Sequence, residues 1–255
     1  LLPALAFNEA TTSTVSDIAS FSYDLSRSMP LLHDLTSLDG AKNFRSKASN
    51  VSINGLSISA IADTPVRAER TKISNCDLVI PIAGRNEVLI GGNSYIFSPQ
   101  NSVFFANGDK RTFQTDERSI VHMNLNPSRL TSVLGSMISS RRTSFDFVEA
   151  ACLPFTYGTM NFLQMFHGLF AQIDAVNGDT RALERIKLDD SIYRLCIALL
   201  KPKEIFQDPF DDGRSKDCSR ELALLCEWLS SQLDQSVSMT DMEERSGLSR
   251  RALQY

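Results

Sequence analysis

The residues best suited to chemistry in this 255-residue chain lie near its C-terminal end. Ser238 and Asp241 have the S-x-x-D spacing of a helix-capping box, in which the hydroxyl accepts a first-turn N–H and the carboxylate reaches back. Gly247 can adopt φ > 0 and turn the chain sharply. Ser249 suits the N-cap of a second helix that begins Arg-Arg-Ala-Leu-Gln-Tyr255. Helix, glycine turn and helix predict a helix-turn-helix, whose second helix enters the major groove of DNA.

The second helix of this motif would present one polar face to DNA. Three residues at positions i, i+3 and i+4 form that face: Arg251, Gln254 and Tyr255. Arginine can bind O6 and N7 of guanine and glutamine can pair with adenine, so this face suits base edges. Three other residues, at or near helix N-termini, suit phosphate: Ser238, Ser249 and Arg250. The alternative interpretation is an ordinary helical hairpin with a solvated arginine pair.

Charge alone does not indicate a nucleic-acid-binding protein. The chain has a formal net charge of −4, and residues 217–255 carry four arginines against seven acidic residues, a balance of −3. Because most DNA-binding modules are basic, contact would depend on a few local side chains. The chain lacks an initiator Met and ends about two turns into the second helix. We therefore expect it to be a trimmed piece whose DNA-binding domain continues beyond Tyr255.

Residues 51–126 predict a β-barrel. Short runs with strand character recur at intervals of about 8–12 residues, separated by Gly, Asn and Pro, which is typical of a sandwich or barrel. The expected strands are Gly55–Ala62, Val66–Ile73, Cys76–Ala83, Glu87–Ile90, Ser94–Phe97, Ser102–Phe105, Lys110–Thr115 and Ile120–Leu125. A double-sheet jelly roll fits this series best. The preceding residues 1–50 are expected to form an N-terminal arm.

From residue 127 the apolar pattern becomes helical. Helices are expected over Pro127–Ser140, Thr156–Val176 and Thr180–Leu200, and their wide apolar stripes favour core packing or a dimer face within a helical segment, residues 127–200. Residues 201–216 contain two prolines, three aspartates and a glycine, which predicts a linker. Residues 217–255 would then hold an amphipathic helix, Asp217–Leu233, with Leu225 and Cys226 facing inward, followed by the helix-turn-helix.

The order of jelly roll, helical segment, linker, helix and helix-turn-helix resembles that of the AraC/XylS family of transcription regulators. Two stretches carry the resemblance. Cys218–Tyr255 is similar to the first of that family's two helix-turn-helix units, through the pattern Ser238…Met242…Gly247-Leu-Ser249-Arg-Arg-Ala-Leu253. Glu87–Phe105 is similar to the cupin-like sensor domain of such proteins. The resemblance implies an α+β chain: an N-terminal cupin-like jelly roll, a helical dimerisation segment and an all-α helix-turn-helix domain, here incomplete.

The same resemblance implies a function. It implies a cytoplasmic homodimer that binds promoter DNA, contacts RNA polymerase and responds to a small organic effector. By position it makes Arg251, Gln254 and Tyr255 the base-reading residues. The sequence departs from the family at Glu243, where a small residue usually packs against the second helix. The family's second helix-turn-helix also lies outside the chain.

The three histidines bear on the chemistry of the barrel. A metal-dependent cupin needs closely spaced histidines and a carboxylate, whereas His33, His122 and His167 lie far apart, so we expect no metal and no cofactor. His122 alternates with apolar residues within Ile120–Leu125 and could hold the carboxylate of an effector if its side chain faces inward; a surface or structurally satisfied histidine is the alternative. With Tyr95 and Phe105 it forms the predicted effector pocket, although the aromatic side chains could instead simply fill the barrel.

The sequence does not predict an enzyme. It contains no G-x-S-x-G, P-loop or G-x-G-x-x-G motif. The adjacent acids Asp189 and Asp190 are expected to be solvated charges. The five cysteines have no C-x-x-C spacing, which favours reduced, buried thiols in a cytosolic protein, and no apolar run reaches the roughly 18 residues of a membrane span. The alternative to a DNA-binding regulator is a small-molecule-binding or enzymatic cupin with an appended helical region.

Overall fold

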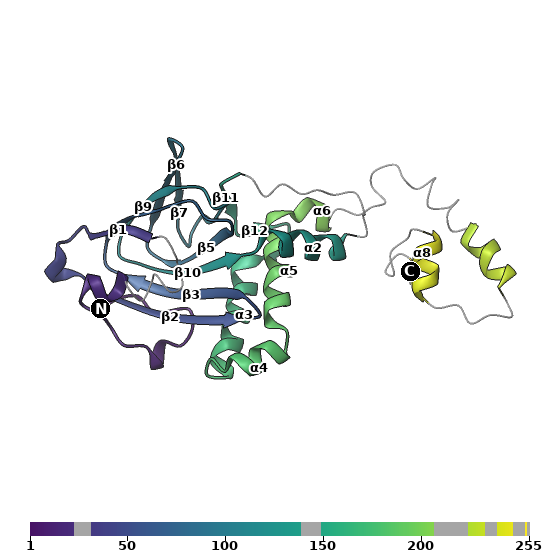
Figure 1. The fold of residues 1–255 in the computed structure, drawn as a ribbon, viewed down its shortest axis with the longest axis horizontal. Helices are drawn as coiled ribbons and strands as arrows, with labels where there is room; N and C mark the ends of the chain where they lie inside the picture. The colour runs from purple at the N-terminus through teal and green to yellow at the C-terminus, as the bar shows by residue number, and fades with distance from the viewer. Residues whose placement is uncertain (23–31, 139–148, 207–223, 233–238, 247–252, 254–255) are drawn as a thin grey trace. The chain divides into compact units, whose positions relative to one another are not determined.

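The structure is a computed structural model that describes residues 1–22, 32–138, 149–206, 224–232, 239–246 and 253 (Figure 1). The chain divides into two compact units. The first comprises Leu1–Leu134 and Ser144–Leu200, and the second comprises Gly135–Thr143 and Lys201–Tyr255.

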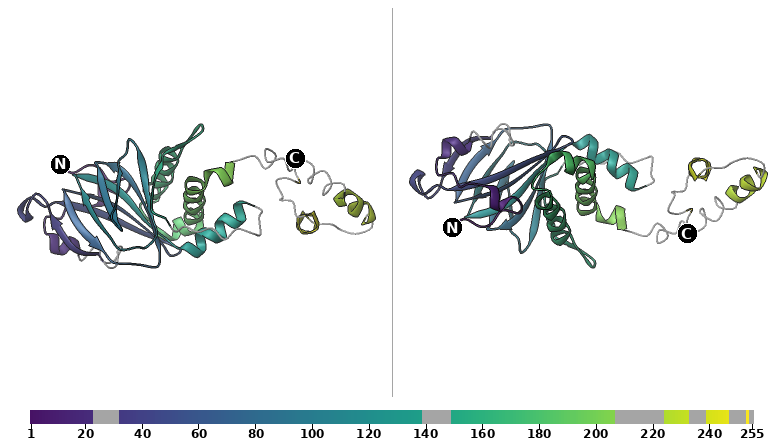
Figure 2. Two further views of the ribbon diagram at one scale, coloured as in Figure 1. Left: turned by 90° about the horizontal axis from the view of Figure 1, so that it is seen from above. Right: turned by 90° about the horizontal axis from the view of Figure 1, so that it is seen from below.

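Two antiparallel sheets form the centre of the first unit. The five-stranded sheet has the order β1 (Leu32–Ser37), β4 (Val66–Arg70), β9 (Arg111–Thr115), β6 (Asn86–Ile90), β7 (Asn93–Phe97). The six-stranded sheet has the order β11 (Ala151–Pro154), β8 (Ser102–Ala106), β5 (Cys76–Ala83), β10 (Arg118–Leu125), β3 (Leu56–Asp63), β2 (Ser46–Ile53). The chain is thus a mixed α+β protein whose antiparallel sheets are consistent with the expected jelly roll (Figure 2).

All eight expected strands are present, but two further strands lie in the segment expected to be an arm. β1 lies before residue 51, and β2 begins before it, ends at Ile53 and pairs along its whole length with β3. β2 was not predicted because its residues are mostly polar, although Asn54-Gly55 is a typical hairpin turn sequence. Both residues have positive φ, 48° and 81°, as the tight turn between twisted strands requires.

Apolar side chains from both sheets meet in the space between them. This core cluster consists of Phe21, Phe44, Ile61, Val66, Ala68, Val79, Val88, Phe97, Phe104, Ala106 and Ile120. Since side chains alternate along a strand, Val66, Ala68 and Arg70 of β4 all face this interior. The interior is therefore apolar along most of its length and becomes charged at the end of β4.

The opposite face of the six-stranded sheet is buried as well. Nearly every residue of β3 and β10 is inaccessible to solvent, on both faces of the strands. N-terminal residues help to cover that face: Ser119 Oγ donates to the Ala4 carbonyl at 2.7 Å, and the Phe7 ring lies 6.0 Å from that of Phe170. Burial on two faces explains why β3 and β10 are rich in apolar residues rather than strictly alternating.

The helical part of the first unit is more interrupted than expected. The described helices between β10 and residue 201 are α2 (Pro127–Met137), α3 (Phe162–Ala175), α4 (Thr180–Arg185) and α5 (Leu188–Leu200). The start of the expected helix Thr156–Val176 is a small hairpin, β12 (Thr156–Tyr157) and β13 (Met160–Asn161), after which Asn161 caps α3 by accepting from Gln164 N at 3.1 Å. The expected helix Thr180–Leu200 is broken at Lys187, whose φ of 58° is incompatible with a continuous α-helix.

A partly buried ion pair joins α2, α5 and the β2–β3 turn. Arg129 Nη2 pairs with Asp189, whose other oxygen accepts from Asn54 Nδ2 at 3.0 Å. The Arg129 guanidinium also lies over the Tyr193 ring, 4.7 Å from its centroid. The expectation that Asp189 is a solvated charge is therefore wrong, because its side chain is 1% exposed. Its neighbour Asp190 is partly exposed and pairs with Arg194.

Gly108 permits a close approach of two loops at the charged end of the sandwich. Ile73 N donates to the Gly108 carbonyl at 2.7 Å, which takes Ile73 out of β4, and a Cβ on Gly108 would lie 1.8 Å from the Ile73 carbonyl oxygen. Gly108→Ala should therefore lower the free energy of unfolding by about 1–3 kcal/mol or more, since backbone atoms must move.

The matched control is Gly168→Ala in α3, where an added Cβ meets nothing within 4 Å. Because glycine is the poorer helix former, that substitution should leave stability unchanged or raise it by up to about 1 kcal/mol. Denaturant unfolding of the two variants measures the difference, and equal stabilities would contradict the described loop contact.

Candidate functional site

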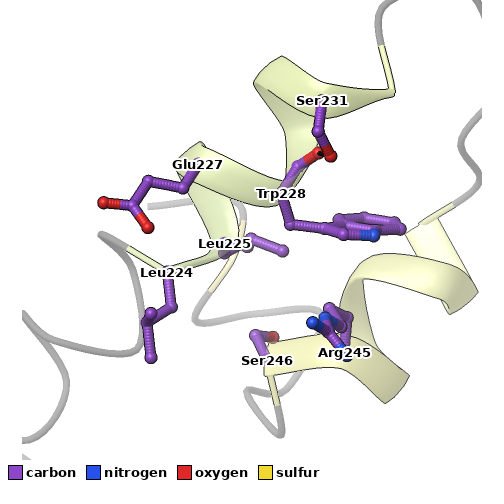
Figure 3. Close-up of a pocket in the computed structure, with 7 residues that line it drawn as sticks. All are labelled: Leu224, Leu225, Glu227, Trp228, Ser231, Arg245 and Ser246. Atoms are coloured by element: carbon purple, nitrogen blue, oxygen red, sulfur yellow. Dashed lines mark hydrogen bonds between the residues drawn. The ribbon is translucent and has the colours of Figure 1, made fainter.

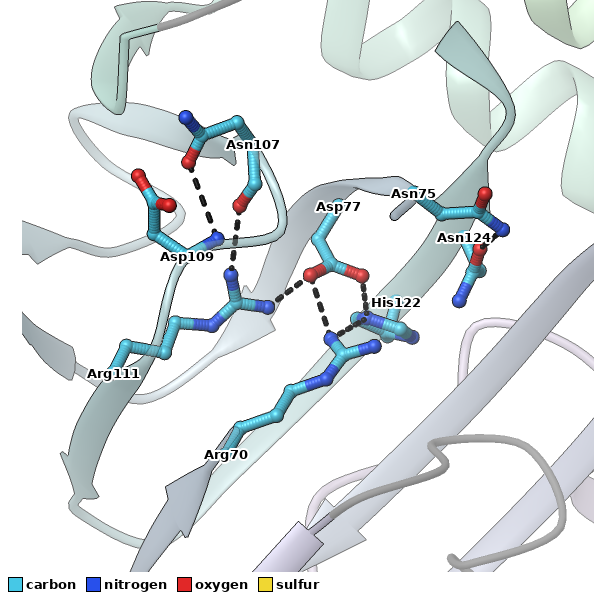
Figure 4. Close-up of polar contacts among 8 residues, drawn as sticks. All are labelled: Arg70, Asn75, Asp77, Asn107, Asp109, Arg111, His122 and Asn124. Atoms are coloured by element: carbon cyan, nitrogen blue, oxygen red, sulfur yellow. Dashed lines mark hydrogen bonds and ion pairs between the residues drawn. The ribbon is translucent and has the colours of Figure 1, made fainter. Parts of the chain in front are cut away.

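Four buried polar side chains form a cluster between the sheets (Figure 4). Asp77 of β5 lies at its centre. Arg70 Nη1 of β4 donates to Asp77 Oδ2 at 2.6 Å, and Arg111 Nη2 of β9 pairs with the same oxygen. His122 Nε2 of β10 lies 2.8 Å from Asp77 Oδ1 and 3.3 Å from Arg70 Nη1. We call these four residues the interior charge cluster.

Strand pairing brings the two arginines together. Arg70 and Arg111 are directly opposite each other in the β4–β9 register, and both side chains face the interior. Like charges in such a pair repel each other. Asp77 comes from the other sheet and is shared by both guanidinium groups, so the cluster links the two sheets electrostatically.

The pKa shifts in the cluster follow from its burial. Burial by itself would raise the pKa of Asp77, but its interactions with His122, Arg111 and Arg70 hold the pKa well below the usual range. Burial lowers the pKa of His122; Asp77 opposes this effect, and the charges of Arg70 and Arg111 add to it. Asp77 is therefore a carboxylate and His122 a neutral imidazole at neutral pH, with one ring nitrogen directed at the carboxylate.

A second polar cluster links the sheets elsewhere and differs in its charge balance. Arg118 donates from Nε and Nη2 to the two oxygens of Asp63, at 3.0 and 3.2 Å, and from Nη1 to Asn86 Oδ1 at 2.8 Å. The guanidinium also lies 5.4 Å from the centroid of the Phe113 ring. One cation thus meets one anion in the bidentate geometry typical of strong arginine–carboxylate pairs.

The structure separates the three residues of the predicted effector pocket. His122 faces the interior and belongs to the charge cluster. Tyr95 packs against the core cluster, 5.7 Å from the Phe104 ring. Phe105 is buried, but it alternates with the interior residues Phe104 and Ala106 and therefore points to the opposite face of the six-stranded sheet. Phe105 and His122 consequently cannot line one interior pocket.

The sequence reasoning missed Arg70, Asp77 and Arg111. A signal was present, since Arg70 continues the inward-facing positions of Val66 and Ala68 at period two. A charged residue on an inward face needs a partner. Which residue supplies that partner depends on the pairing of strands from both sheets, and the sequence pattern did not predict that pairing.

The second unit holds the start of the predicted DNA-binding region. Residues 224–231 are helical, and α8 spans Met239–Ser246. A hollow of about 410 Å³ lies beside these helices, lined by Leu224, Leu225, Glu227, Trp228, Ser231, Arg245 and Ser246 (Figure 3). Leu225 is buried as expected, whereas Cys226 is exposed.

The six predicted DNA contacts lie outside the described residues. They are Ser238, Ser249, Arg250, Arg251, Gln254 and Tyr255. The described helix α8, Met239–Ser246, lies in the stretch expected to form the first helix of the motif.

Within the described ranges, no group of three or more His, Cys, Asp or Glu side chains is placed to hold a metal ion. Every helix in those ranges is too short or too polar to span a bilayer.

Comparisons with known proteins support the fold. No protein-family model matches the sequence, and a search of curated proteins finds no match either. Among solved structures, the chain is similar to the AraC-like transcriptional activator CuxR, with a TM-score of 0.54, 14% identity, and coverage of 95% of this chain and 87% of that one.

Two partial similarities involve other regulators. The Cupin_2 domain of an XRE-family transcriptional regulator from Enterobacter cloacae has a TM-score of 0.28 and 16% identity, over 32% of this chain and 95% of that one. An HTH_3-family transcriptional regulator from Vibrio cholerae has a TM-score of 0.30 and 12% identity, over 43% of this chain and 63% of that one. Scores this low carry no conclusion. At 14% identity, the comparison with CuxR shows a shared fold alone.

Proposed function

We propose that this chain is a DNA-binding transcription regulator of AraC type. The observation that carries the proposal is that Met239–Ser246 forms a helix, α8, in the stretch of sequence between Ser238 and Gly247. A helix in this stretch suits the first helix of a helix-turn-helix. The similarity of 95% of the chain to the fold of an AraC-like transcriptional activator supports the same proposal.

DNA recognition in this proposal rests on the second helix of the motif. Arg251, Gln254 and Tyr255 would contact base edges in the major groove. Ser238, Ser249 and Arg250 would contact phosphates and fix the register of the helix on the duplex. The acidic balance of residues 217–255 means that these few side chains, rather than a general positive field, would supply the attraction.

The N-terminal β-sandwich would act as the regulatory domain. We propose a cytoplasmic homodimer, in which paired half-sites raise affinity through effective concentration, and a contact with RNA polymerase at the promoter. We also propose that the chain is not an enzyme. Its interior polar residues Arg70, Asp77, Arg111 and His122 form ion pairs and hydrogen bonds with one another between the sheets.

The experiment that tests the function is selection of bound duplexes from a random-sequence DNA library by the full-length protein. Enrichment of one motif, repeated about 10 base pairs apart or at a multiple of that spacing, is the expected result for a dimer with one recognition helix in each half-site. Recovery of unenriched sequence would exclude sequence-selective recognition and leave the non-DNA cupin as the better account.

Arg251→Ala in the full-length protein should relax the preference at one base pair of the selected site. A bidentate arginine–guanine contact contributes about 1–3 kcal/mol of discrimination. The measurement is the affinity for duplexes that differ at each position of the motif in turn.

The matched control is Arg181→Ala, which removes the same charge from an exposed position of α4 in the first unit. It should leave the preference at every base pair unchanged. If Arg251→Ala and Arg181→Ala give the same profile, Arg251 does not read DNA.

A further inference from the structure

Arg70 has one edge of its guanidinium without a partner. Its Nη1 binds Asp77 and lies near His122, but Nε and Nη2 are buried and have no hydrogen-bond partner among the described residues. The side chain is only 2% exposed, so bulk solvent does not reach this edge. Buried donors without acceptors are costly, and an arginine leaves two here.

The protein shows elsewhere what such an edge binds. In the Asp63–Arg118 pair, the same two nitrogens, Nε and Nη2, donate to the two oxygens of one carboxylate. That edge matches the spacing of carboxylate oxygens, which is why arginine recognises planar anions in a bidentate manner. Arg70 therefore offers, in the same sandwich, the donor pair that Arg118 uses for Asp63.

The net charge of the interior charge cluster also favours a bound anion. Arg70 and Arg111 are cations, Asp77 is the carboxylate that they share, and His122 is neutral, which leaves one positive charge in excess. Acids next to the two arginines in sequence do not supply the balance: Glu69 pairs with Lys110 at 3.6 Å and Asp109 with Lys72 at 3.7 Å, both in exposed pairs. Uncompensated buried charge costs several kcal/mol.

A further unpartnered group lies on the same interior surface. Ser59 of β3 is fully buried, and within the described ranges its Oγ has no hydrogen-bond partner. It is the register partner of His122 in the β3–β10 pair and lies two residues before Ile61 of the core cluster, so its side chain faces the interior. The interior side chains around the cluster, Ala68, Val79, Phe104 and Ala106, are apolar.

We propose that the space between the sheets binds a small monocarboxylate, whose two oxygens accept from Nε and Nη2 of Arg70. The bound anion would balance the excess charge of Arg70 and Arg111, and the Ser59 hydroxyl is a further donor toward it. The apolar surroundings suit a short hydrocarbon remainder rather than a polyol. His122 acts as a positioning residue that holds Asp77, and does not itself bind the ligand. The site concerns the sandwich alone, so its test does not involve DNA.

The test measures binding of sodium acetate to the DNA-free protein by isothermal titration and by the thermal unfolding temperature. Sodium chloride at the same ionic strength and the neutral isostere acetamide are the comparisons. The expected result is saturable binding of acetate and a higher unfolding temperature in acetate than in either comparison. Equal stabilisation by chloride would overturn the carboxylate assignment in favour of an inorganic anion, and no difference among the three would overturn the site.

Two variants locate the site. Arg70→Lys keeps the charge but loses the two-nitrogen edge, and should weaken acetate binding at least about tenfold. Ser59→Ala removes only a hydroxyl and should weaken binding less. Unchanged acetate affinity in Arg70→Lys would overturn the assignment to Arg70. If Arg70→Lys does not fold, acetate, chloride and acetamide are compared on the unaltered protein and on Ser59→Ala. Unchanged acetate affinity in Ser59→Ala, together with equal effects of acetate and chloride, would overturn the proposal.

Discussion

Asp77→Asn is expected to lower the free energy of unfolding by about 3–5 kcal/mol, the cost of removing one partner from a buried ion pair. The substitution leaves Arg70 and Arg111 facing each other across β4 and β9 without a counter-charge. The asparagine side chain has nearly the same volume, so the loss measures charge rather than packing. Urea denaturation at neutral pH is the measurement.

Two comparisons make this expectation specific. Asp190→Asn removes a carboxylate from the partly exposed pair with Arg194 and should cost no more than about 0.5 kcal/mol. Arg111→Met removes the excess positive charge from the interior and should cost clearly less than Asp77→Asn. If Asp77→Asn is as mild as Asp190→Asn, the interior charge cluster does not hold the sheets together as described.

Asp63→Asn should have an effect of similar size, about 3–5 kcal/mol, because it leaves Arg118 buried without its carboxylate. The double substitution Asp63→Leu with Arg118→Met should recover most of that loss, since replacing both partners of a buried pair by apolar residues is often neutral or stabilising. Asn86 then loses one hydrogen bond, which limits the recovery. Urea denaturation of the three proteins measures both effects, and a double variant no more stable than Asp63→Asn would contradict the pairing.

The two clusters have different consequences for function. Arg118 and Asp63 balance each other and use both edges that arginine offers, so this pair has a structural role alone. Arg70 and Arg111 share one carboxylate, and Arg70 has two donors without acceptors. A structural role accounts for the balanced Arg118–Asp63 pair and only in part for the two arginines on Asp77, which is why the anion site is placed at Arg70.

The strands along the chain could be predicted because turn residues and the alternation of apolar and polar residues are local signals. Cys76–Ala83 forms β5 with the expected bounds, since a short apolar run between turns suits a strand buried on both faces. β1 was missed because Leu32–Ser37 alternates imperfectly and has a register irregularity between His33 and Thr36. The helix break at Lys187 could not be predicted, because the residue with the left-handed backbone conformation is a lysine rather than a glycine or asparagine.

The interior charge cluster could not be predicted from local signals. Arg70 and Asp77 are close in sequence but belong to different sheets, and Arg111 and His122 reach them only through the pairings β4–β9 and β5–β10. The alternation of His122 with apolar neighbours leaves two interpretations, a ligand-binding residue and a surface or structurally satisfied histidine. The structure gives it Asp77 and Arg70 as partners, because the inward face that it occupies also holds those two charges.

The most direct test of the proposed regulator is the ratio of two dissociation constants for the full-length protein at one fixed salt concentration. One duplex carries the motif selected from the random library, and the other carries the same bases in scrambled order. A sequence-specific regulator should bind the first at least about 10³-fold more tightly. A ratio near one would contradict the account, whatever the absolute affinity, because charge alone gives binding without sequence preference.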